Sequence, residues 1–428
     1  MEDKHIGDEA FYHFVWQHKL YKTHHLQTVD GLPLEVIHPG FLNQDAGPDF
    51  FNVKIKIDGV LWAGNVEIHL KSSDWKLHHH QDDKAYDNVI LHVVAQYTAP
   101  VLRSDRSEIP SLEIEALPSV YAQYEQLKKE KNTIACYRHL TSIDKLFWIN
   151  YSDRLVTERL ESKSSSIQQT LAQSHQDWEA VFFQKLCRSF GASINADAFE
   201  RLGQSLSYKI IAKHRNNLLQ IEALLFGQAG FLEEDSVDTY HQELKKEYLF
   251  LKNKYRLSPL EKYLWKFLRL RPVNFPTIRL AQLAYLLHTK DSLLHEVISR
   301  PLTEMEACFQ AQTSPYWESH YRFGKTSQKR VKKLGRSTIH SLLINAVTPT
   351  LFNYGKAKGN EEYCHKALAL LEQLPFEKNS ITHKWKTYGI EGSKAYDSQA
   401  QIQLYKAYCL PKKCLHCKIG HHFLSRQQ

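Results

Sequence analysis

Long apolar runs are absent from this sequence. No stretch approaches the roughly 18 to 20 consecutive apolar residues that a membrane-spanning helix needs. The N-terminus, MEDKHIGDEAFYHF, carries acids where a secretory signal is basic, and it has no apolar core. Hydrophobic residues make up 43 % and charged residues 24 % of the 428-residue chain, which are ordinary values for a globular protein. We therefore expect a folded cytoplasmic protein without a membrane span.

A disulfide framework and a fixed-period repeat are absent as well. The seven cysteines are an odd number, of which four are scattered and three crowd the C-terminus. This pattern favours reduced thiols with one local cluster. A solenoid is not expected, because no repeat period is visible. The net charge of +8 favours an anionic partner, and the 24 histidines direct attention to metal sites.

Two regions with different periodicity follow one another along the chain. Up to about residue 120, strand-like runs lie close to turn signals, and from about 142 the pattern is helical nearly to the end. The expected order in the first region is helix, three strands, a helix over 75–86, and two further strands. The sequence therefore predicts an α+β fold. A domain over 1–135 with a mixed sheet and flanking helices precedes a mostly α-helical domain over 142–428, which ends in a cysteine-rich knuckle.

The predicted strand VLWAGNVEIHLK has an unusual polar face. Residues two apart in a strand share a face, so Glu67 and His69 are neighbours and Lys71 lies one step further. Such alternation is ordinary on a solvent-facing strand. Here, however, Asp49 begins the preceding strand, and the following strand, NVILHVVA, is apolar at nearly every position. We therefore expect a central strand with a functional face.

The spacing of these acids resembles a known signature. Pro48-Asp49, an 18-residue step and then Glu67-Ile68-His69 resemble the PD-(D/E)XK nuclease motif, and the element order over residues 8–120 is similar to that superfamily's core. The resemblance implies a restriction-endonuclease-like fold and a metal-dependent phosphodiesterase acting on DNA or RNA. It implies that Asp49 and Glu67 bind Mg²⁺ or Mn²⁺, with Glu9 as an auxiliary acid.

One position departs from the motif, because His69 stands where those nucleases carry lysine. Either His69 serves as the base, or Lys71 extends its longer side chain back to the same place. The third alternative is a nucleic-acid-binding or assembly protein that has kept a nuclease-like fold without turnover.

A histidine-rich loop, WKLHHHQDDKAYD, offers a competing site. On a helix, His78 would share a face with Asp82, or His79 with Asp83, and His80 could add a third ligand. This arrangement would fit a zinc hydrolase of a small molecule, although no HExxH motif is present. Alternatively, the loop flanks the same cleft as the acids or faces water.

The C-terminal segment YCLPKKCLHCKIGHHFLSR resembles a zinc knuckle, because Cys414 and Cys417 form a CxxC followed by Ile-Gly. We predict a structural zinc held by Cys409, Cys414, Cys417 and His421, with His422 and Cys364 as alternatives for the fourth place. An iron–sulfur cluster stays open, since some PD-(D/E)XK nucleases hold one with a single upstream cysteine and three late ones. Unmetallated thiols stay open too.

A basic segment, GKTSQKRVKKLGRS over residues 324–337, contains no acid. Such a run is usually a solvated face, but beside a nuclease domain it is predicted to contact the phosphate backbone of nucleic acid. The predicted contacts are Lys325, Lys329, Arg330, Lys332, Lys333 and Arg336.

A second resemblance extends over the whole chain. The segments NQDAGPDF, GNVEIHLKSSDW, RPVNFPTIRLAQLA, INAVTPTLFNYG and KKCLHCKIG are similar to those of a conserved bacterial family of unknown function. This resemblance implies no activity.

Overall fold

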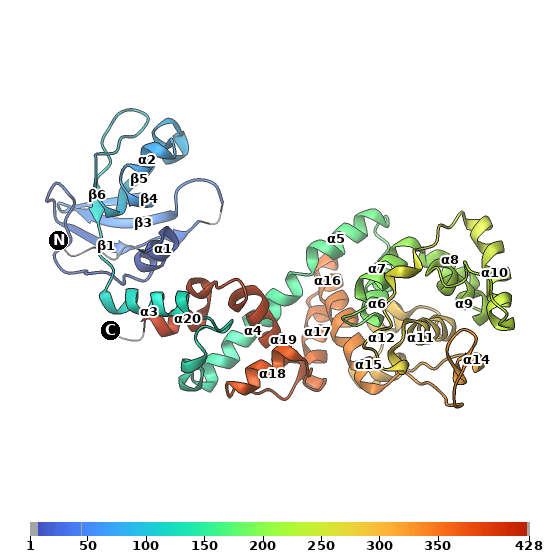
Figure 1. Cartoon of the computed structure of the whole chain (residues 1–428). Helices are drawn as coiled ribbons and strands as arrows, with labels where there is room; N and C mark the ends of the chain where they lie inside the picture. The colour runs from blue at the N-terminus through green and yellow to red at the C-terminus, as the bar shows by residue number, and fades with distance from the viewer. Residues whose placement is uncertain (1–6, 44, 426–428) are drawn as a thin grey trace. The chain divides into compact units, whose positions relative to one another are not determined.

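The computed structural model describes residues 7–43 and 45–425, so residues 1–6 of the N-terminal stretch discussed above lie outside it. The chain forms two compact units (Figure 1). The first unit combines the chain up to Ile143 with the segment from Leu404 onward, and the second spans Asp144–Gln403. None of the helices in the described ranges is long and apolar enough to cross a membrane.

The C-terminal segment belongs to the first unit, and not to the helical region in which the sequence placed it. Contacts with the end of the N-terminal region account for this. The Lys412 ammonium donates to the carbonyl oxygens of Glu130, at 2.9 Å, and of Asn132, and the His139 and Phe423 rings lie 4.0 Å apart. The helical region therefore ends at Gln403.

The first unit is built on a mixed sheet, as predicted. Its strands are β1 Leu34–His38, β2 Phe41–Leu42, β3 Phe50–Ile57, β4 Val60–Lys71, β5 Val89–Gln96 and β6 Ser111–Glu113. Their order is β1-β3-β4-β5-β6, with β2 also paired to β3. Pairing is antiparallel from β1 to β4 and parallel from β4 to β6. Strand β4 is therefore central, with an antiparallel neighbour, β3, on one side and a parallel neighbour, β5, on the other.

The hairpin between β3 and β4 brings the two predicted acids together. Asp58 and Gly59 both have positive φ, 46° and 82°, the conformation of the tight turn that an Asp-Gly pair favours. This turn sets a register in which Phe50 pairs with Val66. Asp49, directly before Phe50, is therefore placed beside Glu67.

Helix α1, Glu9–Gln17, packs against the sheet and contacts β4. Its first turn is capped by the Asp8 carboxylate, which accepts from the Phe11 amide at 3.0 Å. Strand β5 is buried along its length except at Gln96, as expected for a strand covered on both faces. The core of the unit includes Phe11, Trp16, Phe50, Val53, Val66, Ile68, Leu91 and Val93.

The helix predicted over 75–86 does not form. The chain makes one short helix, α2 Asp74–Leu77, and two 3₁₀ turns, His80–Asp82 and Lys84–Tyr86. His79 interrupts the helix because its backbone is left-handed, with φ of 60°. The expected i, i+4 pairs of this loop are therefore wrong. The unit is completed by α3 Pro118–Lys129, a 3₁₀ segment Tyr137–Ser142, a π-helical segment Leu404–Cys409 and α20 Lys418–Ser425.

The second unit is mostly helical, as predicted. Its helices are α4 Lys145–Glu161, α5 Ser164–Gln173, α6 Trp178–Phe190, α7 Ala196–Ser205, α8 Tyr208–His214, α9 Leu218–Gln228, α10 Thr239–Tyr255, α11 Pro276–Thr289, α12 Leu293–Ser299, α13 Met305–Cys308, α14 Pro315–Glu318, α15 Arg336–Leu342, α16 Thr348–Lys358, α17 Glu361–Gln373, α18 Ser380–Thr387 and α19 Ala395–Gln403. The second unit also contains a two-stranded antiparallel ribbon, β7 His320–Arg322 and β8 Lys325–Thr326.

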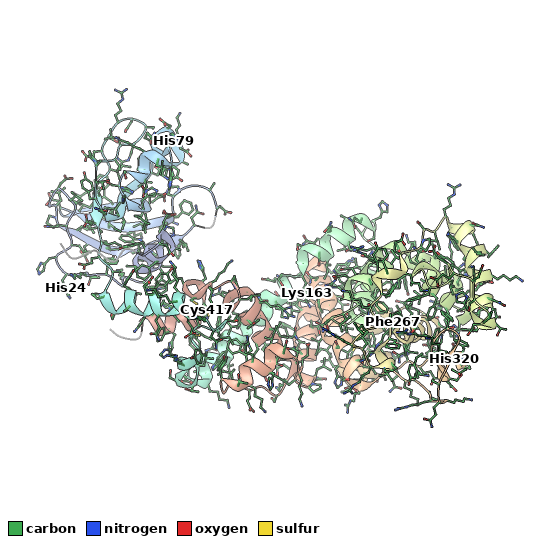
Figure 2. The ribbon with its side chains drawn as sticks, in the orientation of Figure 1. His24, His79, Lys163, Phe267, His320 and Cys417 are labelled. Carbon is green, nitrogen blue, oxygen red and sulfur yellow. The ribbon has the colours of Figure 1, made fainter. Side chains whose placement is uncertain are left out.

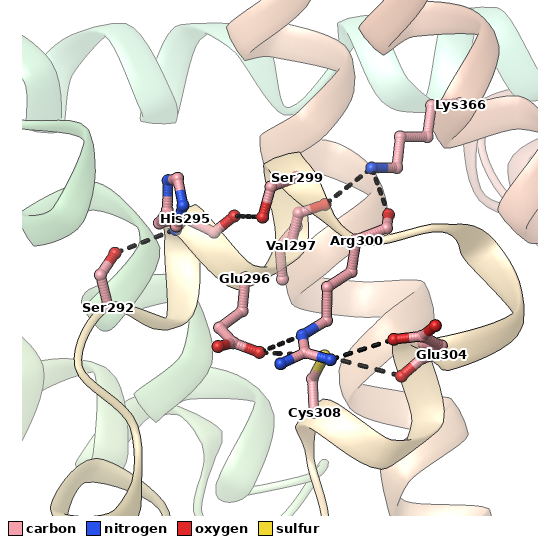
Figure 3. A network of polar contacts seen from close by, with 9 residues as sticks. All are labelled: Ser292, His295, Glu296, Val297, Ser299, Arg300, Glu304, Cys308 and Lys366. Carbon is pink, nitrogen blue, oxygen red and sulfur yellow. Dashed lines mark hydrogen bonds and ion pairs between the residues drawn. The ribbon is translucent and has the colours of Figure 1, made fainter.

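Charged side chains close the end of α12 in this unit. Figure 3 shows Lys366 reaching the carbonyl oxygens at the C-terminal end of the helix, 3.1 Å from that of Val297 and 2.7 Å from that of Arg300. The Arg300 guanidinium pairs with Glu296 and, at 3.0 Å, with Glu304. The Lys366 contacts satisfy carbonyls that a helix end leaves without partners.

Candidate metal centre

The two predicted acids are held by hydrogen bonds to each other's strand. The Asp49 amide donates to Glu67 Oε2 at 3.0 Å, and the Ile68 amide donates to Asp49 Oδ2 at 2.9 Å. Glu67 is only 5 % exposed. The polar face of β4 is therefore buried at Glu67 and His69, and this part of it is not an ordinary solvent-facing edge.

Acidic groups crowd this point. Burial, followed by the nearby Asp49 charge, raises the pKa of Glu67 well above its usual range. The same two causes, in the same order, raise the pKa of Glu9 in the first turn of α1. Because the Asp49 charge opposes the ionisation of Glu67 and Glu9, a bound cation would stabilise the charged forms of these two acids.

The histidine loop meets the same carboxylates. One ring nitrogen from each of His69, His78 and His80 lies within 4.8 Å of the other two. His69 Nε2 is 3.1 Å from His78 Nδ1, and His80 Nε2 is 3.2 Å from Glu67 Oε1. The acid pair and the histidine loop, which the sequence presented as competing sites, therefore form one site.

A second layer of side chains lies beneath this trio. His69 Nδ1 is 2.8 Å from His92 Nε2 on β5, and the Trp75 ring packs edge-on against both imidazoles. Burial, followed by the charge of His92, lowers the pKa of His69 to about 2. Burial and then His80 lower that of His92 to about 3. Both imidazoles are therefore neutral near neutral pH, the form that can coordinate a metal.

Several buried ring nitrogens of this cluster lack a hydrogen-bond partner in the part of the chain that the structure describes. They are His13 Nε2, His80 Nε2 and His92 Nδ1. His13 extends from α1 to within 3.2 Å of Asp49 Oδ2. Burial alone would lower the pKa of His13, but the adjacent Asp49 carboxylate raises it overall. Unpartnered nitrogens beside carboxylate oxygens suit Mn²⁺, Fe²⁺ or Zn²⁺, which accept both atom types.

Two members of the cluster, His13 and His92, were not foreseen from the sequence. A signal for His13 was available, since it lies four residues after Glu9 and therefore on the same face of α1. No sequence signal marked His92, because a single histidine in an apolar strand is usually a core residue. Of the other predicted catalytic residues, Lys71 lies at the exposed end of β4, where its amide donates to Asp74 at 3.0 Å.

The basic segment 324–337 lies in the second unit, and part of it serves the fold. Lys332 is only 4 % exposed, and its ammonium donates to the carbonyl oxygens of Trp317 and, at 2.7 Å, of Glu318. Lys329 and Arg336 lie near acids, at 3.7 Å from Glu318 and 2.9 Å from Glu306. The exposed members of the segment that these contacts leave are Lys325, Arg330 and Lys333.

Comparison with known protein families identifies the family of this chain. A family model described as a protein of unknown function, DUF2851, matches residues 9–380. Neither the curated proteins nor the solved structures contain a match to the chain.

Proposed function

Because the chain belongs to the DUF2851 family, whose function is unknown, we infer its activity from the site itself and propose a metal-dependent phosphodiesterase that acts on nucleic acid. The observation that carries the proposal is the contact of Glu67 with both the Asp49 amide and the His80 ring, at 3.0 and 3.2 Å. These contacts bring two acids and a nitrogen ligand together at one buried point.

We propose that Asp49, Glu67 and His80 hold the ion, with His69 and His78 completing its surroundings. This mixed set of nitrogen and oxygen donors favours Mn²⁺ or another transition metal over Mg²⁺, which prefers oxygen. When bound, the ion would supply Lewis-acid charge for the phosphate and would lower the pKa of a water molecule.

The protein's own groups have separate roles in this proposal. His69, in the place of the expected lysine, is a poor base because its pKa is so low, so a ligand or positioning role fits it better than proton abstraction. The His13 ring lies 3.2 Å from Asp49 Oδ2 and positions that carboxylate, and Glu9 adds negative charge that attracts the ion.

The choice of substrate rests on different observations. The antiparallel β3–β4 pair, the parallel β4–β5 pair and the placement of α1 agree with a restriction-endonuclease-like core, the fold that the sequence motif implies. The net charge of +8 also favours a polyanion.

The test uses the full-length protein, stripped with a chelator and returned to Mn²⁺, with labelled single- and double-stranded DNA and RNA. Cleavage should require the metal, and Glu67→Gln should lower its rate at least about 100-fold, because a metal ligand is lost. Asp58→Asn is the matched control, since Asp58 lies in the turn of the same hairpin and Asn tolerates its positive φ. Undiminished cleavage by Glu67→Gln would refute the assignment.

Two other outcomes would identify the alternatives. Nucleic-acid binding at low salt without cleavage would support the non-catalytic binding protein. The histidine trio also favours a second candidate, a zinc hydrolase of a small molecule. Hydrolysis of a small phosphodiester with Zn²⁺, with no action on any nucleic acid, would establish it.

A further inference from the structure

Three late cysteines of the first unit lie on one tightly folded segment. The Lys412 amide donates to the Cys409 carbonyl and the Cys417 amide donates to the Cys414 carbonyl, both at 3.2 Å. Lys412 has a φ of 56°, which turns the chain between Cys409 and Cys414. The segment 409–417 is therefore a pair of linked turns.

The residue at position 420 is restricted to glycine. A Cβ atom on Gly420 would lie 2.1 Å from the Cys414 carbonyl oxygen, a distance at which no side chain can be accommodated. The helix α20 can thus begin directly beside the CxxC turn.

A fourth cysteine comes from the distant end of the N-terminal region. Cys136 precedes the 3₁₀ segment Tyr137–Ser142, and its carbonyl accepts from the His139 amide at 2.9 Å. On one side of it, Lys412 binds the carbonyls of Glu130 and Asn132, and on the other the His139 ring packs on the ring of Phe423. Contacts on both sides therefore hold the Cys136 loop against the C-terminal segment, in which Figure 2 labels Cys417.

Three of the four thiols are buried. Cys136 and Cys409 are each 8 % exposed and Cys417 is 6 % exposed. Burial, then the charges of Cys417 and Cys414, raise the pKa of Cys136 to about 12. Burial, then Cys417, Cys136 and Cys414, raise the pKa of Cys409. Cys136, Cys409 and Cys414 take part in no disulfide in the described chain.

We propose that Cys136, Cys409, Cys414 and Cys417 hold a metal centre through four thiolates. The centre would tie the C-terminal segment to the end of the N-terminal region. His421, the fourth ligand predicted from the sequence, has another neighbour, because its ring lies 3.9 Å from that of His18, tilted by 31°. Metal binding would displace the thiol protons and so oppose the effect of burial.

The chemistry of the set admits two occupants, a single Zn²⁺ or an iron–sulfur cluster. Zinc–sulfur bonds of about 2.3 Å require four sulphurs within about 4 Å of each other. Among the described residues, the side chains whose ligand atoms lie within 4.8 Å of one another are the histidine trio. No three of the four sulphurs meet this spacing. The wider spread suits a cluster, in which each sulphur binds its own iron atom.

The test measures zinc, iron and acid-labile sulfide in the full-length protein, produced with added iron and purified without oxygen. One centre per chain is expected, either as zinc without sulfide or as iron with sulfide. Cys136→Ser should lose it as fully as Cys414→Ser does. Cys364→Ser, a half-buried cysteine of the second unit, should retain it. A wild-type protein without metal, or Cys136→Ser with full loading, would overturn the proposal.

A second measurement covers the case in which Cys136→Ser does not fold. Thiols of the wild-type protein are alkylated before and after metal removal and located by mass spectrometry. Cys136 should become reactive together with Cys409, Cys414 and Cys417, whereas Cys364 should react equally in both states. If metal removal leaves the labelling of Cys136 unchanged, Cys136 is not a ligand.

Discussion

Two buried glutamates, one in each unit, illustrate how an acid proposed to bind a metal differs from a structural one. Glu67 and Glu222 are 5 % and 0 % exposed, and burial is the largest cause of the raised pKa of each. Glu222 accepts hydrogen bonds from the hydroxyls of Tyr240 and, at 3.0 Å, Ser314. Glu67 instead faces a second acid and imidazoles with unpartnered nitrogens. Burial and a raised pKa therefore do not identify a site, whereas the identity of the neighbours does.

The largest effect is expected from removing the structural acid. Glu222→Ala should lower the free energy of unfolding by about 3 to 5 kcal/mol, since it leaves two hydroxyls without their acceptor and opens a cavity. Chemical denaturation of the full-length protein, with and without Mn²⁺, measures this loss, which should not depend on the metal. Glu243→Ala, at an exposed position of α10, is the control. A loss that Mn²⁺ restores would place Glu222 in a metal site.

The pH dependence of Glu222 follows from its pKa of about 7, compared with an ordinary 4.5. Because the folded state binds the proton more tightly than the unfolded state, the free energy of unfolding should fall as pH rises from 4.5 to 7 and then level off. The total fall is about 3 kcal/mol. Denaturation at several pH values, compared with Glu222→Gln, should show a flatter profile in the variant. Equal slopes would mean that other groups account for the pH dependence.

A metal should stabilise the first unit through Glu67. Mn²⁺ at 100 times its dissociation constant should add about 2.7 kcal/mol to the stability of the wild-type protein. Hydrogen exchange of the β4 and β5 amides reports this locally. Glu67→Gln should lose most of the gain, although without metal it should be about as stable as the wild type. The raised pKa of Glu67 keeps its carboxyl protonated and uncharged near neutral pH, and Gln retains an oxygen that can accept from the Asp49 amide. Glu222→Gln should be stabilised by Mn²⁺ as much as the wild type is. If Mn²⁺ stabilises neither variant, the two acids do not differ in their link to the metal.

Two adjacent histidines test the metal centre more finely. The side chain of His80 is 11 % exposed and contacts Glu67, whereas that of His79 is 80 % exposed (Figure 2). His80→Asn should weaken Mn²⁺ binding about 10- to 100-fold, as measured by calorimetry. His79→Asn should leave it unchanged, since Asn accommodates the left-handed backbone at that position. Equal affinities would remove His80 from the site.

Sequence patterns predicted the sheet better than the loops. The alternation of β3 and the Asp-Gly turn indicate the hairpin whose register places Asp49 beside Glu67. The apolar run of β5 indicates a strand covered on both faces. The 75–86 helix was wrong, since one left-handed residue breaks a pattern that is otherwise compatible with a helix.

Tertiary contacts explain the other misses. Residues 259–271, PLEKYLWKFLRLR, lie within the region that the sequence predicts to be mostly helical, but the structure there forms a short 3₁₀ turn, Lys262–Leu264. The Trp265 indole donates to the Ala229 carbonyl at 2.8 Å, and Asn195 binds both the amide and the carbonyl of Lys266. Cys136 could not be grouped with the late cysteines for the same reason, since only the folded chain brings it near them.

The smallest expected effect concerns two neighbouring lysines. It tests whether hydrogen bonds within the protein again separate a structural residue from one that binds a ligand. Lys333 is exposed, whereas its neighbour Lys332 is buried against backbone carbonyls. If the basic segment contacts nucleic acid, Lys333→Ala should reduce the slope of log affinity against log salt concentration by about one, with little change in stability. Fluorescence anisotropy at several salt concentrations measures the slope, and Lys246→Ala, exposed on α10, is the control. Identical slopes for both variants would mean that Lys333 contributes only general charge, since each true phosphate contact releases its own counterion.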